Sequence, residues 1–301
     1  MYYRSLNEEL REKFGEKLYK LALDGGFTCP NRDGTIGSRG CTFCLGGSGS
    51  FAEGKCASVS EQIERAKRRV EKKNPSGKYI AYFQSYTNTY APVKRLEALF
   101  GEAIAHPDIA ALSVGTRPDC LPPEVLELLA RLNKIKPVWV ELGLQTIHEQ
   151  TAEKIRRGYG LSVFDKAVKD CKAAGLYTVV HMIIGLPGET PEMAAQTADY
   201  IGKGGADGIK LQLLHVLRGT DMAEQYAAGE FEVMSMEEYI SALEECVRRL
   251  PPQMTVHRLT GDGDKKYLIA PLWSADKKRV LNAVNGAFRR DNVVQGERYE
   301  V

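Results

Sequence analysis

Cysteines are the residues of this sequence whose type and spacing most directly indicate chemistry. Cys29, Cys41 and Cys44 lie within the glycine-rich segment GGFTCPNRDGTIGSRGCTFCLGGSGSF. Its Gly, Asn and Asp residues favour turns, so the segment can fold back and bring the three thiols together. Three thiolates can hold three irons of a [4Fe–4S] cluster and leave the fourth iron open to a further ligand. The spacing therefore predicts a metal centre with these cysteines as ligands.

Two other interpretations of the cysteines stay open at this point. Cys56 extends the pattern to C-x11-C-x2-C-x11-C, which could form a four-cysteine zinc site. The cysteines could also be ordinary buried residues, although a C-x2-C pair in a glycine-rich loop more often binds metal. Cys120, Cys171 and Cys246 belong to neither pattern, and we interpret them as incidental.

The composition is typical of a globular protein of a reducing compartment. The chain has 301 residues, of which 43% are hydrophobic and 27% charged, with a net charge of +2. The charged N-terminal segment has no apolar signal region, and the apolar stretch 177–187 is too short to span a bilayer. Seven cysteines without an export signal point to the cytoplasm and to no membrane partner. The nearly neutral charge neither demands nor excludes a nucleic-acid partner.

Alternating strands and helices must position the cysteine segment. The sequence predicts strands at residues 17–23, 78–83, 110–114, 137–142, 177–184 and 208–214, and helices at 59–72, 93–105, 123–132, 163–174 and 191–204. Several strands are nearly continuous apolar runs, which are typical of parallel strands covered on both faces. We therefore predict an α/β fold, a (β/α)6 partial TIM barrel with its chemistry at the C-terminal ends of the strands.

The rhythm changes after residue 214. Helical patterns at 221–228 and 236–250 lead to two prolines, the segment HRLTGDGD and a last helix near 275–289. We divide the chain into a barrel at residues 1–215, with the cluster loop at 25–56, and a C-terminal extension at 216–301. We expect the extension to pack on the barrel and to serve as a lid over the substrate.

Seven motifs in order cover nearly the whole chain: GGFTCPNRDGTIGSRGCTFC, YFQSYTNTYAP, SVGTRPDCLP, ELGLQTIHEQTAEKIRRGY, HMIIGLPGET, LQLLHVLRGTDM, and HRLTGD with IAPLW. Together they make the chain resemble the radical S-adenosylmethionine (SAM) superfamily. The branch is that of the Elongator catalytic subunit and the oxygen-independent coproporphyrinogen oxidase, and the match is best with the YhcC/YtqA-like subfamily. The resemblance implies a [4Fe–4S] cluster on the three cysteines that cleaves SAM to a 5′-deoxyadenosyl radical.

The resemblance also assigns a SAM-binding role to the run after the second predicted strand. By position, Gln84, Tyr86, Thr87 and Asn88 match residues that bind the SAM amino group in relatives. Hydroxyl, amide and carbonyl groups suit an ammonium ion. A polar turn that caps the strand is the alternative interpretation.

Further cofactor contacts follow from the other motifs. Gln145 in ELGLQ matches a glutamine near the SAM ribose, and Arg157 matches an arginine that pairs with the SAM carboxylate. Arg156 is the neighbouring alternative for that role. Arg117 of SVGTRPDCLP is a further cofactor-binding candidate, and Gly185 of GLPG would shape the floor beneath adenine or simply form a tight turn.

Two positions depart from the pattern of the family. Relatives often have a glutamate where this chain has Gly115, and an aspartate where it has His181. His181 is accordingly either a residue of the SAM site or a buried strand histidine.

The C-terminal extension supplies the candidates for substrate binding and catalysis. His257 and Asp262 are the catalytic candidates, within a polar group that also includes Arg258, Thr260 and Asp264. A polar loop that joins two packed elements is the alternative interpretation.

The resemblance points to tRNA as the substrate, specifically the C5 side chain of a wobble uridine. Hydrogen abstraction beside the nitrogen of a carboxymethylaminomethyl group, oxidation to an imine and hydrolysis would leave aminomethyl. Basic stretches at 65–73 and 277–290 could bind phosphates, although solvated helix faces explain them equally well. Flavodoxin or ferredoxin is the expected reductant. The alternatives are a radical SAM enzyme for a small metabolite or peptide, and a zinc-stabilised RNA-binding module without turnover.

Overall fold

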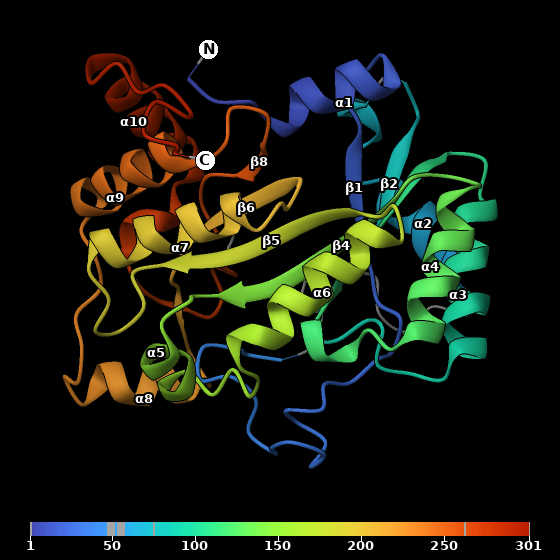
Figure 1. Ribbon diagram of the computed structural model, residues 1–301, viewed down its shortest axis with the longest axis horizontal. Helices are drawn as coiled ribbons and strands as arrows, with labels where there is room; N and C mark the ends of the chain where they lie inside the picture. Colours follow the sequence, from blue (N-terminus) through green and yellow to red (C-terminus); the bar gives the residue numbers. More distant parts are fainter. Residues whose placement is uncertain (1, 47–51, 53–57, 75, 262, 301) are drawn as a thin grey trace.

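A curved parallel sheet forms the centre of the computed structural model, which describes residues 2–46, 52, 58–74, 76–261 and 263–300 (Figure 1). Seven strands lie in the order β1-β2-β3-β4-β5-β6-β8, and each neighbouring pair is parallel. The strands of this sheet are β1 (Tyr19–Leu23), β2 (Tyr79–Phe83), β3 (Ile109–Thr116), β4 (Val138–Gln145), β5 (Tyr177–Ile184), β6 (Gly208–Leu213) and β8 (Thr255–Arg258).

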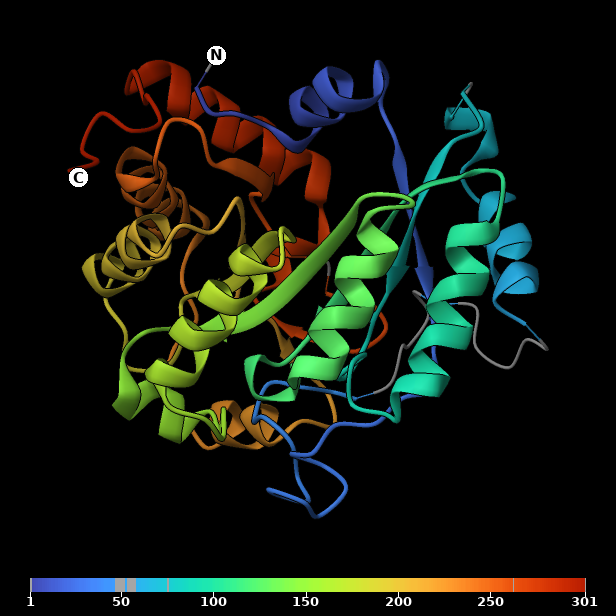
Figure 2. The ribbon, with the colours of Figure 1, turned by 45° about the vertical axis from the view of Figure 1, so that its right-hand side comes forward.

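Helices cover the outer face of this sheet, as Figure 2 shows for α3, α4 and α6. The α-helices are α1 (Leu6–Phe14), α2 (Val59–Lys67), α3 (Val93–Ala105), α4 (Pro123–Asn133), α5 (Glu149–Lys154), α6 (Leu161–Ala173), α7 (Pro191–Lys203), α8 (Asp221–Ala227), α9 (Met236–Arg249) and α10 (Lys277–Arg290). Short 3₁₀ helices are η1 (Glu71–Lys73), η2 (Pro118–Cys120) and η3 (Leu272–Ala275).

Each strand divides its side chains between the helices and the inside of the curve. Leu112, Val140 and Val180 point outward into one large apolar core shared with the helices. Because side chains alternate along a strand, the residues between them point inward, among them Glu141 on β4. The inside of the sheet therefore carries polar groups that the apolar runs conceal in the sequence.

Helix α1 closes one end of the barrel. It begins at Ser5 with a capping box to Glu8, and its Leu10 packs against Ile80 and Trp139 near the amino ends of β2 and β4. This plug leaves the carboxyl ends of the strands as the open end, where chemistry is found in barrels of this kind.

The predicted partial barrel is confirmed, with one strand more than expected. All six predicted strands and all five predicted barrel helices are present, and the three predicted helices of the extension correspond to α8, α9 and α10. The additional strand, β8, comes from the C-terminal extension and pairs with β6. Two short strands, β7 (Val216–Leu217) and β9 (Leu268–Ala270), form a separate antiparallel pair.

The proposed boundary between residues 215 and 216 stays a prediction, although a strand from beyond it completes the sheet. The sequence did not predict helix α1. The helix predicted at residues 59–72 is shorter than expected, because α2 ends at Lys67. None of the helices in the described parts of the chain is both long and apolar enough to cross a membrane.

Candidate active site

A cavity of about 290 Å³ opens at the carboxyl ends of the strands. Its lining includes most of the predicted site residues: Cys29, Cys41, Cys44, Gln84, Tyr86, Thr87, Asn88, Arg117, Gln145, Arg157 and His181. These residues come from six separate segments of the chain, so their meeting in one cavity is a property of the fold. Cys56 and Asp262, which the sequence also singled out, lie outside the described residues.

The described part of the cysteine loop comprises residues 25–46. Its three thiols are partly buried and line the cavity. The backbone N–H of Cys44 donates to the carbonyl of Cys41 at 3.0 Å, and the Asn31 amide contacts the Cys41 Sγ at 3.6 Å. The Arg32 guanidinium donates to the Cys44 carbonyl. Burial raises the pKa of the Cys41 thiol to about 11, so a bound cation is needed to keep it a thiolate at neutral pH.

The spacing of the thiols tests which metal they fit. Four sulfur ligands of one zinc ion lie roughly 3.8 Å apart, as Zn–S bonds of about 2.3 Å in a tetrahedron require. Among the described residues, no three Cys, His or carboxylate ligand atoms that include these thiols lie within 4.8 Å of one another. The three sulfurs are thus spread more widely than a single zinc ion needs, and they fit a larger, multi-iron group better.

The cavity rim, defined as the side chains of Thr87, Asn88 and Gln145, carries acceptors that the protein leaves unused. Asn88 Nδ2 donates to the carbonyls of Ser85 at 2.9 Å and Gly115 at 2.8 Å. In contrast, Thr87 Oγ1, Asn88 Oδ1 and Gln145 Oε1 are buried without a hydrogen-bond partner. Buried polar atoms of this kind are costly, and a ligand with N–H or O–H groups would satisfy them. The rim therefore fits a donor-bearing ligand such as SAM.

The backbone near the rim is held in unusual conformations. Tyr86 (φ 61°), Gln145 (φ 71°) and Arg156 (φ 55°) are three of the four non-glycine residues with positive φ in the described chain. Such conformations cost free energy and cluster at functional sites. A Cβ at Gly143 would lie 2.8 Å from Gln145 Nε2, so a larger residue there would displace the end of the Gln145 side chain.

The two predicted arginines, Arg117 and Arg157, meet behind the cysteine loop. Both guanidinium groups stack on the Tyr159 ring, at 5.0 Å and 4.8 Å from its centroid. Arg157 is 2% exposed and donates to three backbone carbonyls and to Glu149 at 3.1 Å. The alternative, Arg156, instead donates to the Gly40 carbonyl at 3.0 Å and pairs with Asp221, outside the cavity lining.

The inner end of the cavity is a charged network that the sequence reasoning missed. We call it the cavity floor and define it as Lys20, Ser113, Glu141, His181 and Lys210. Fully buried Glu141 accepts from Lys20 at 2.5 Å, Ser113 at 2.6 Å and His181 at 2.6 Å, and also from Lys210. The sequence does carry a signal of this network, because Lys20, Glu141 and Lys210 are charged residues within three otherwise apolar strands. Each of them occupies a strand position that points into the barrel.

Burial and neighbouring charges fix the protonation of the floor. Burial alone would raise the pKa of Glu141, but the charges of Lys20 and Lys210 hold it well below its usual value. Burial, with the charge of Lys210, lowers the pKa of His181 to about 4, so His181 is a neutral donor to Glu141 at pH 7. His181 therefore both lines the cavity and is a hydrogen-bonded strand histidine.

Two predicted residues lie away from the cavity lining. His257 packs on Trp139 and Tyr177, with ring centroids at 5.5 Å and 5.9 Å, near the plugged end of the barrel. Its neighbour Arg258 lines the cavity instead. Gly185, with φ 89°, follows β5 and lies against Met234. A Cβ added at Gly185 would lie 3.3 Å from Met234 Sδ. His257 therefore lies outside the lining of this cavity and contacts Trp139, whose ring centroid is 5.2 Å from Lys20 Nζ.

A second cavity and a groove continue from the first. The second cavity, about 370 Å³, shares Phe43, Gln212 and Arg258 with the first and extends to Gly261 and Gly263 of the C-terminal extension. The same two glycines line a groove whose basic residues are Lys265, Lys277, Lys278 and Arg279. Acidic Asp264 and Asp276 also line this groove.

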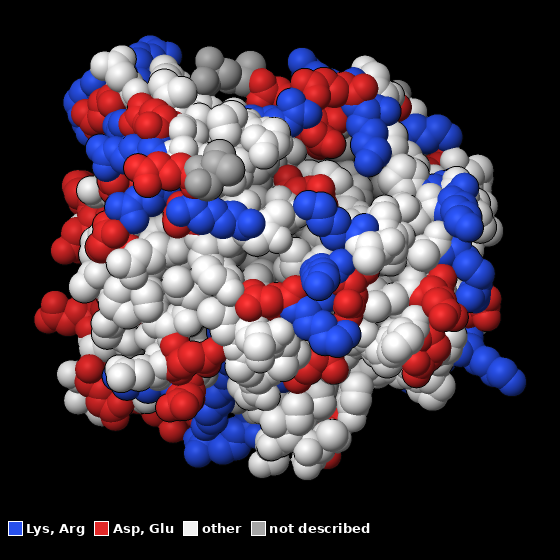
Figure 3. Space-filling model, viewed as in Figure 1, with Lys and Arg blue, Asp and Glu red and all other residues white. Residues whose placement is uncertain are grey.

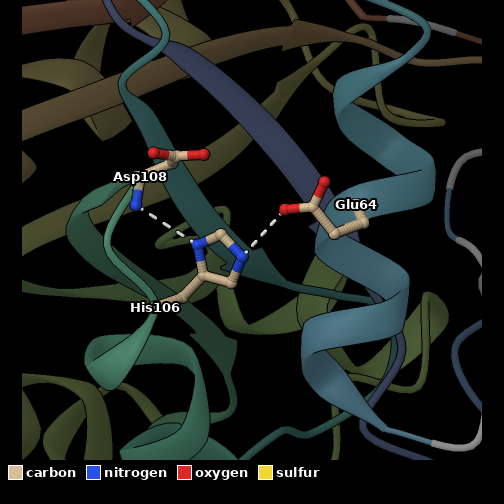
Figure 4. A group of neighbouring side chains, drawn as sticks. All are labelled: Glu64, His106 and Asp108. Atoms are coloured by element: carbon tan, nitrogen blue, oxygen red, sulfur yellow. Dashed lines mark hydrogen bonds and ion pairs between the residues drawn. The ribbon is translucent and has the colours of Figure 1, made fainter.

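One other group of side chains has the composition of a metal site. Glu64, His106 and Asp108 lie together between α2 and β3, as Figure 4 shows. However, Lys67 Nζ lies 2.8 Å from Glu64 and 2.6 Å from Asp108. The ammonium already supplies the positive charge that a metal ion would bring, so we interpret this group as a surface ion-pair network.

Comparison with known families agrees with this geometry. Residues 33–201 match the Radical SAM superfamily, and residues 206–290 match the Radical_SAM C-terminal domain. The chain is 44% identical to the uncharacterized protein YtqA of Bacillus subtilis, over 99% of this chain and 93% of that protein. It is 39% identical to protein YhcC of Escherichia coli K12, over 89% and 86% of the two chains.

More distant similarity extends to tRNA-modifying proteins. A tRNA uridine(34) acetyltransferase of Methanocaldococcus jannaschii is 30% identical over 50% of this chain and 28% of that protein. Among solved structures, the Elp3 of Methanocaldococcus infernus superposes with a TM-score of 0.71 at 18% identity, over 92% of this chain and 64% of that one. This last likeness shows a shared fold.

These matches decide between the interpretations that the cysteines alone left open, because a zinc-stabilised module without turnover is not what the family contains. The predicted roles of individual residues stay predictions. The chain belongs to the radical SAM superfamily, whose members are enzymes that use a [4Fe–4S] cluster and SAM.

Proposed function

We propose that this radical SAM enzyme acts on tRNA and converts the carboxymethylaminomethyl group on C5 of a wobble uridine to aminomethyl. The observation that carries the proposal is that the second cavity shares lining residues both with the first cavity and with the basic groove at the start of α10. Lysine and arginine side chains in such a groove suit an RNA backbone. The partial identity with a tRNA uridine(34) acetyltransferase supports the same substrate.

The chain's own residues have separate tasks in this proposal. Cys29, Cys41 and Cys44 hold three irons of the cluster, and the cavity rim binds the amino and ribose groups of SAM. Arg157 anchors the SAM carboxylate with its remaining donor capacity. When bound, the cluster and SAM supply the 5′-deoxyadenosyl radical, with SAM as the two-electron oxidant overall. A flavodoxin or ferredoxin type protein delivers the reducing electron.

The reaction on the side chain balances without a further oxidant. The carbon between the amino nitrogen and the carboxylate loses a hydrogen atom, and the loss of a proton and of one more electron, which the oxidised cluster would take up, gives an imine. Water then adds to the imine, and the C–N bond breaks to leave aminomethyluridine and glyoxylate.

The basic surface is local. Figure 3 shows acidic and basic side chains interspersed over α9 and α10 on the face it presents. In the basic stretch of α2, Arg65 pairs with Glu61 and Lys67 pairs with Glu64 and Asp108. Of the two predicted basic stretches, we assign RNA contact to the one that begins α10, because Lys277, Lys278 and Arg279 line the groove.

Nucleoside mass spectrometry of tRNA from a deletion strain tests the proposal. We expect the aminomethyl-derived nucleosides to fall and carboxymethylaminomethyluridine to accumulate, and a plasmid copy to restore the profile. A copy with Cys41→Ala should not restore it. An unchanged wobble-uridine profile in the deletion strain would contradict the tRNA substrate and leave a small metabolite or peptide as the substrate to pursue.

A further inference from the structure

Two lysines, Lys210 buried and Lys20 partly buried, share one carboxylate at the cavity floor. Glu141 is 1% exposed, and its oxygens accept four hydrogen bonds, two of them from Lys20 and Lys210. A carboxylate has about four acceptor positions, so Glu141 is fully used by the protein. His181 is neutral at pH 7 and adds no charge. One negative charge therefore faces two positive charges within this network.

Of the two lysines, Lys210 is the one that lines the cavity. Lys210 is 4% exposed. Its Nζ donates to Glu141 and, at 3.3 Å, to the Tyr82 hydroxyl. An ammonium has three N–H donors, so one donor of Lys210 is left beyond these two contacts. The Lys210 ammonium also lies 4.6 Å from the centroid of the Tyr82 ring, which fixes its position.

The charge of Lys210 is poorly compensated in the protein as it stands. Burial lowers the pKa of Lys210 to about 7; Glu141 opposes this shift, whereas Lys20 and Arg258 add to it. Arg258 of β8 pairs with Lys210 of β6 in the sheet, and it lines the same cavity. An anion placed at the floor would gain from these positive charges and would favour the charged form of Lys210.

We propose that Lys210 binds the carboxylate of the substrate side chain and is thus a specificity-determining residue. This inference rests on the proposed function and names the group of the tRNA that the floor recognises. With its carboxylate on Lys210, the substrate extends from the floor toward the cysteine loop, so that the carbon next to the carboxylate lies inside the cavity. A side chain without a carboxylate leaves the third N–H donor of Lys210 without an anionic partner and is bound less tightly.

Binding of two RNA stem–loops tests this proposal on the cluster-loaded enzyme. One stem–loop carries carboxymethylaminomethyluridine, and the other carries the corresponding primary amide, which has the same shape without the charge. We expect the wild type to bind the acid about tenfold more tightly than the amide, because a charge-assisted hydrogen bond is lost in the amide. Lys210→Gln should bind both alike, whereas Lys210→Arg should keep a preference for the acid.

The ratio of the two affinities separates this inference from general RNA binding. Lys203→Gln removes a positive charge on α7 that pairs with Asp199 at the surface, and it should leave the ratio unchanged. Equal binding of acid and amide by the wild type, or a preference retained in Lys210→Gln, would overturn the role of Lys210 while the tRNA function stands. If the wild type recognises neither RNA and the deletion strain has an unchanged nucleoside profile, the proposed function fails and this inference fails with it.

Discussion

The rim and the floor of the same cavity are built in opposite ways. At the cavity rim, Thr87, Asn88 and Gln145 each keep a buried acceptor without a partner. At the cavity floor, Glu141 has every acceptor position filled by the protein's own side chains. The acceptors of the floor are therefore satisfied by the protein itself, whereas the acceptors of the rim need a ligand. Glu141 thus serves the network within the protein, whereas the rim acceptors are available to a cofactor.

The cysteine loop is the extreme case of a region that depends on a ligand. Cys41→Ala should abolish cluster assembly and lower 5′-deoxyadenosine formation at least a hundredfold, because two thiolates cannot hold the cluster. Cys171→Ala, on the buried face of α6, is the matched control and should keep its iron. Iron and sulfide content with product formation measures both. Full iron content in Cys41→Ala would contradict the assignment.

Neutralisation of Glu141 should lower the free energy of unfolding more than neutralisation of an exposed glutamate. Glu141→Gln leaves Lys20 and Lys210 buried without their counter-ion, and we expect a loss of about 3–5 kcal/mol in the free energy of unfolding. Glu97→Gln breaks an exposed pair with Arg131 and should cost less than about 1 kcal/mol. Urea unfolding compares the two variants. Equal losses would show that the floor is not a structural network.

Two threonines on the same loop sharpen the comparison. Thr87→Val removes a buried hydroxyl that has no partner, so we expect unchanged or higher stability and roughly tenfold weaker SAM binding. Thr89→Val removes a hydroxyl that lies 2.5 Å from both Thr116 Oγ1 and the Cys120 carbonyl, so it should lose about 1–2 kcal/mol of stability and retain SAM affinity. Equilibrium SAM binding and thermal unfolding measure these effects, and a reversal of the two patterns would refute the distinction.

The pH dependence of stability gives the smallest expected effect. Burial lowers the pKa of His181 to about 4, whereas the unfolded chain has an ordinary histidine pKa near 6.5. Below about pH 6.5 the unfolded state binds a proton that the folded state does not, so stability falls as the pH decreases toward 4. Between pH 7 and 5 we expect a loss on the order of 1–2 kcal/mol that His181→Gln lacks. Urea titrations at both pH values test this, and identical slopes in the two proteins would contradict it.

The sequence was sufficient for features that repeat or lie close together. Apolar runs predicted the six barrel strands, and the spacing of Cys29, Cys41 and Cys44 predicted residues that line one cavity. Strand β8 was missed because Thr255–Arg258 has no apolar run and is recognised only through its pairing with β6. Helix α1 was missed although Ser5 and Glu8 carry a capping-box signal.

The cavity floor could not be derived from the sequence for a different reason. Glu141 lies 121 residues after Lys20 and 69 residues before Lys210, and the three residues belong to three different strands. Their contact depends on the register of strands β1 to β6, and no local pattern specifies a register between distant strands. Burial likewise decides that His257 packs on Trp139 while Arg258 reaches the cavity.

The ends of the described chain are joined to each other, and this has a consequence for synthesis on the ribosome. The Arg4 N–H donates to the Gln295 side chain at 2.8 Å across 291 residues, and Val256 of β8 donates to the Arg4 carbonyl at 2.8 Å. Arg4 and Gln295 are therefore synthesised roughly 15–60 s apart at ordinary elongation rates, and their hydrogen bond forms only after that interval. The edge of β6 lacks its partner until β8 has also been synthesised, and a chaperone is well placed to cover this exposed edge.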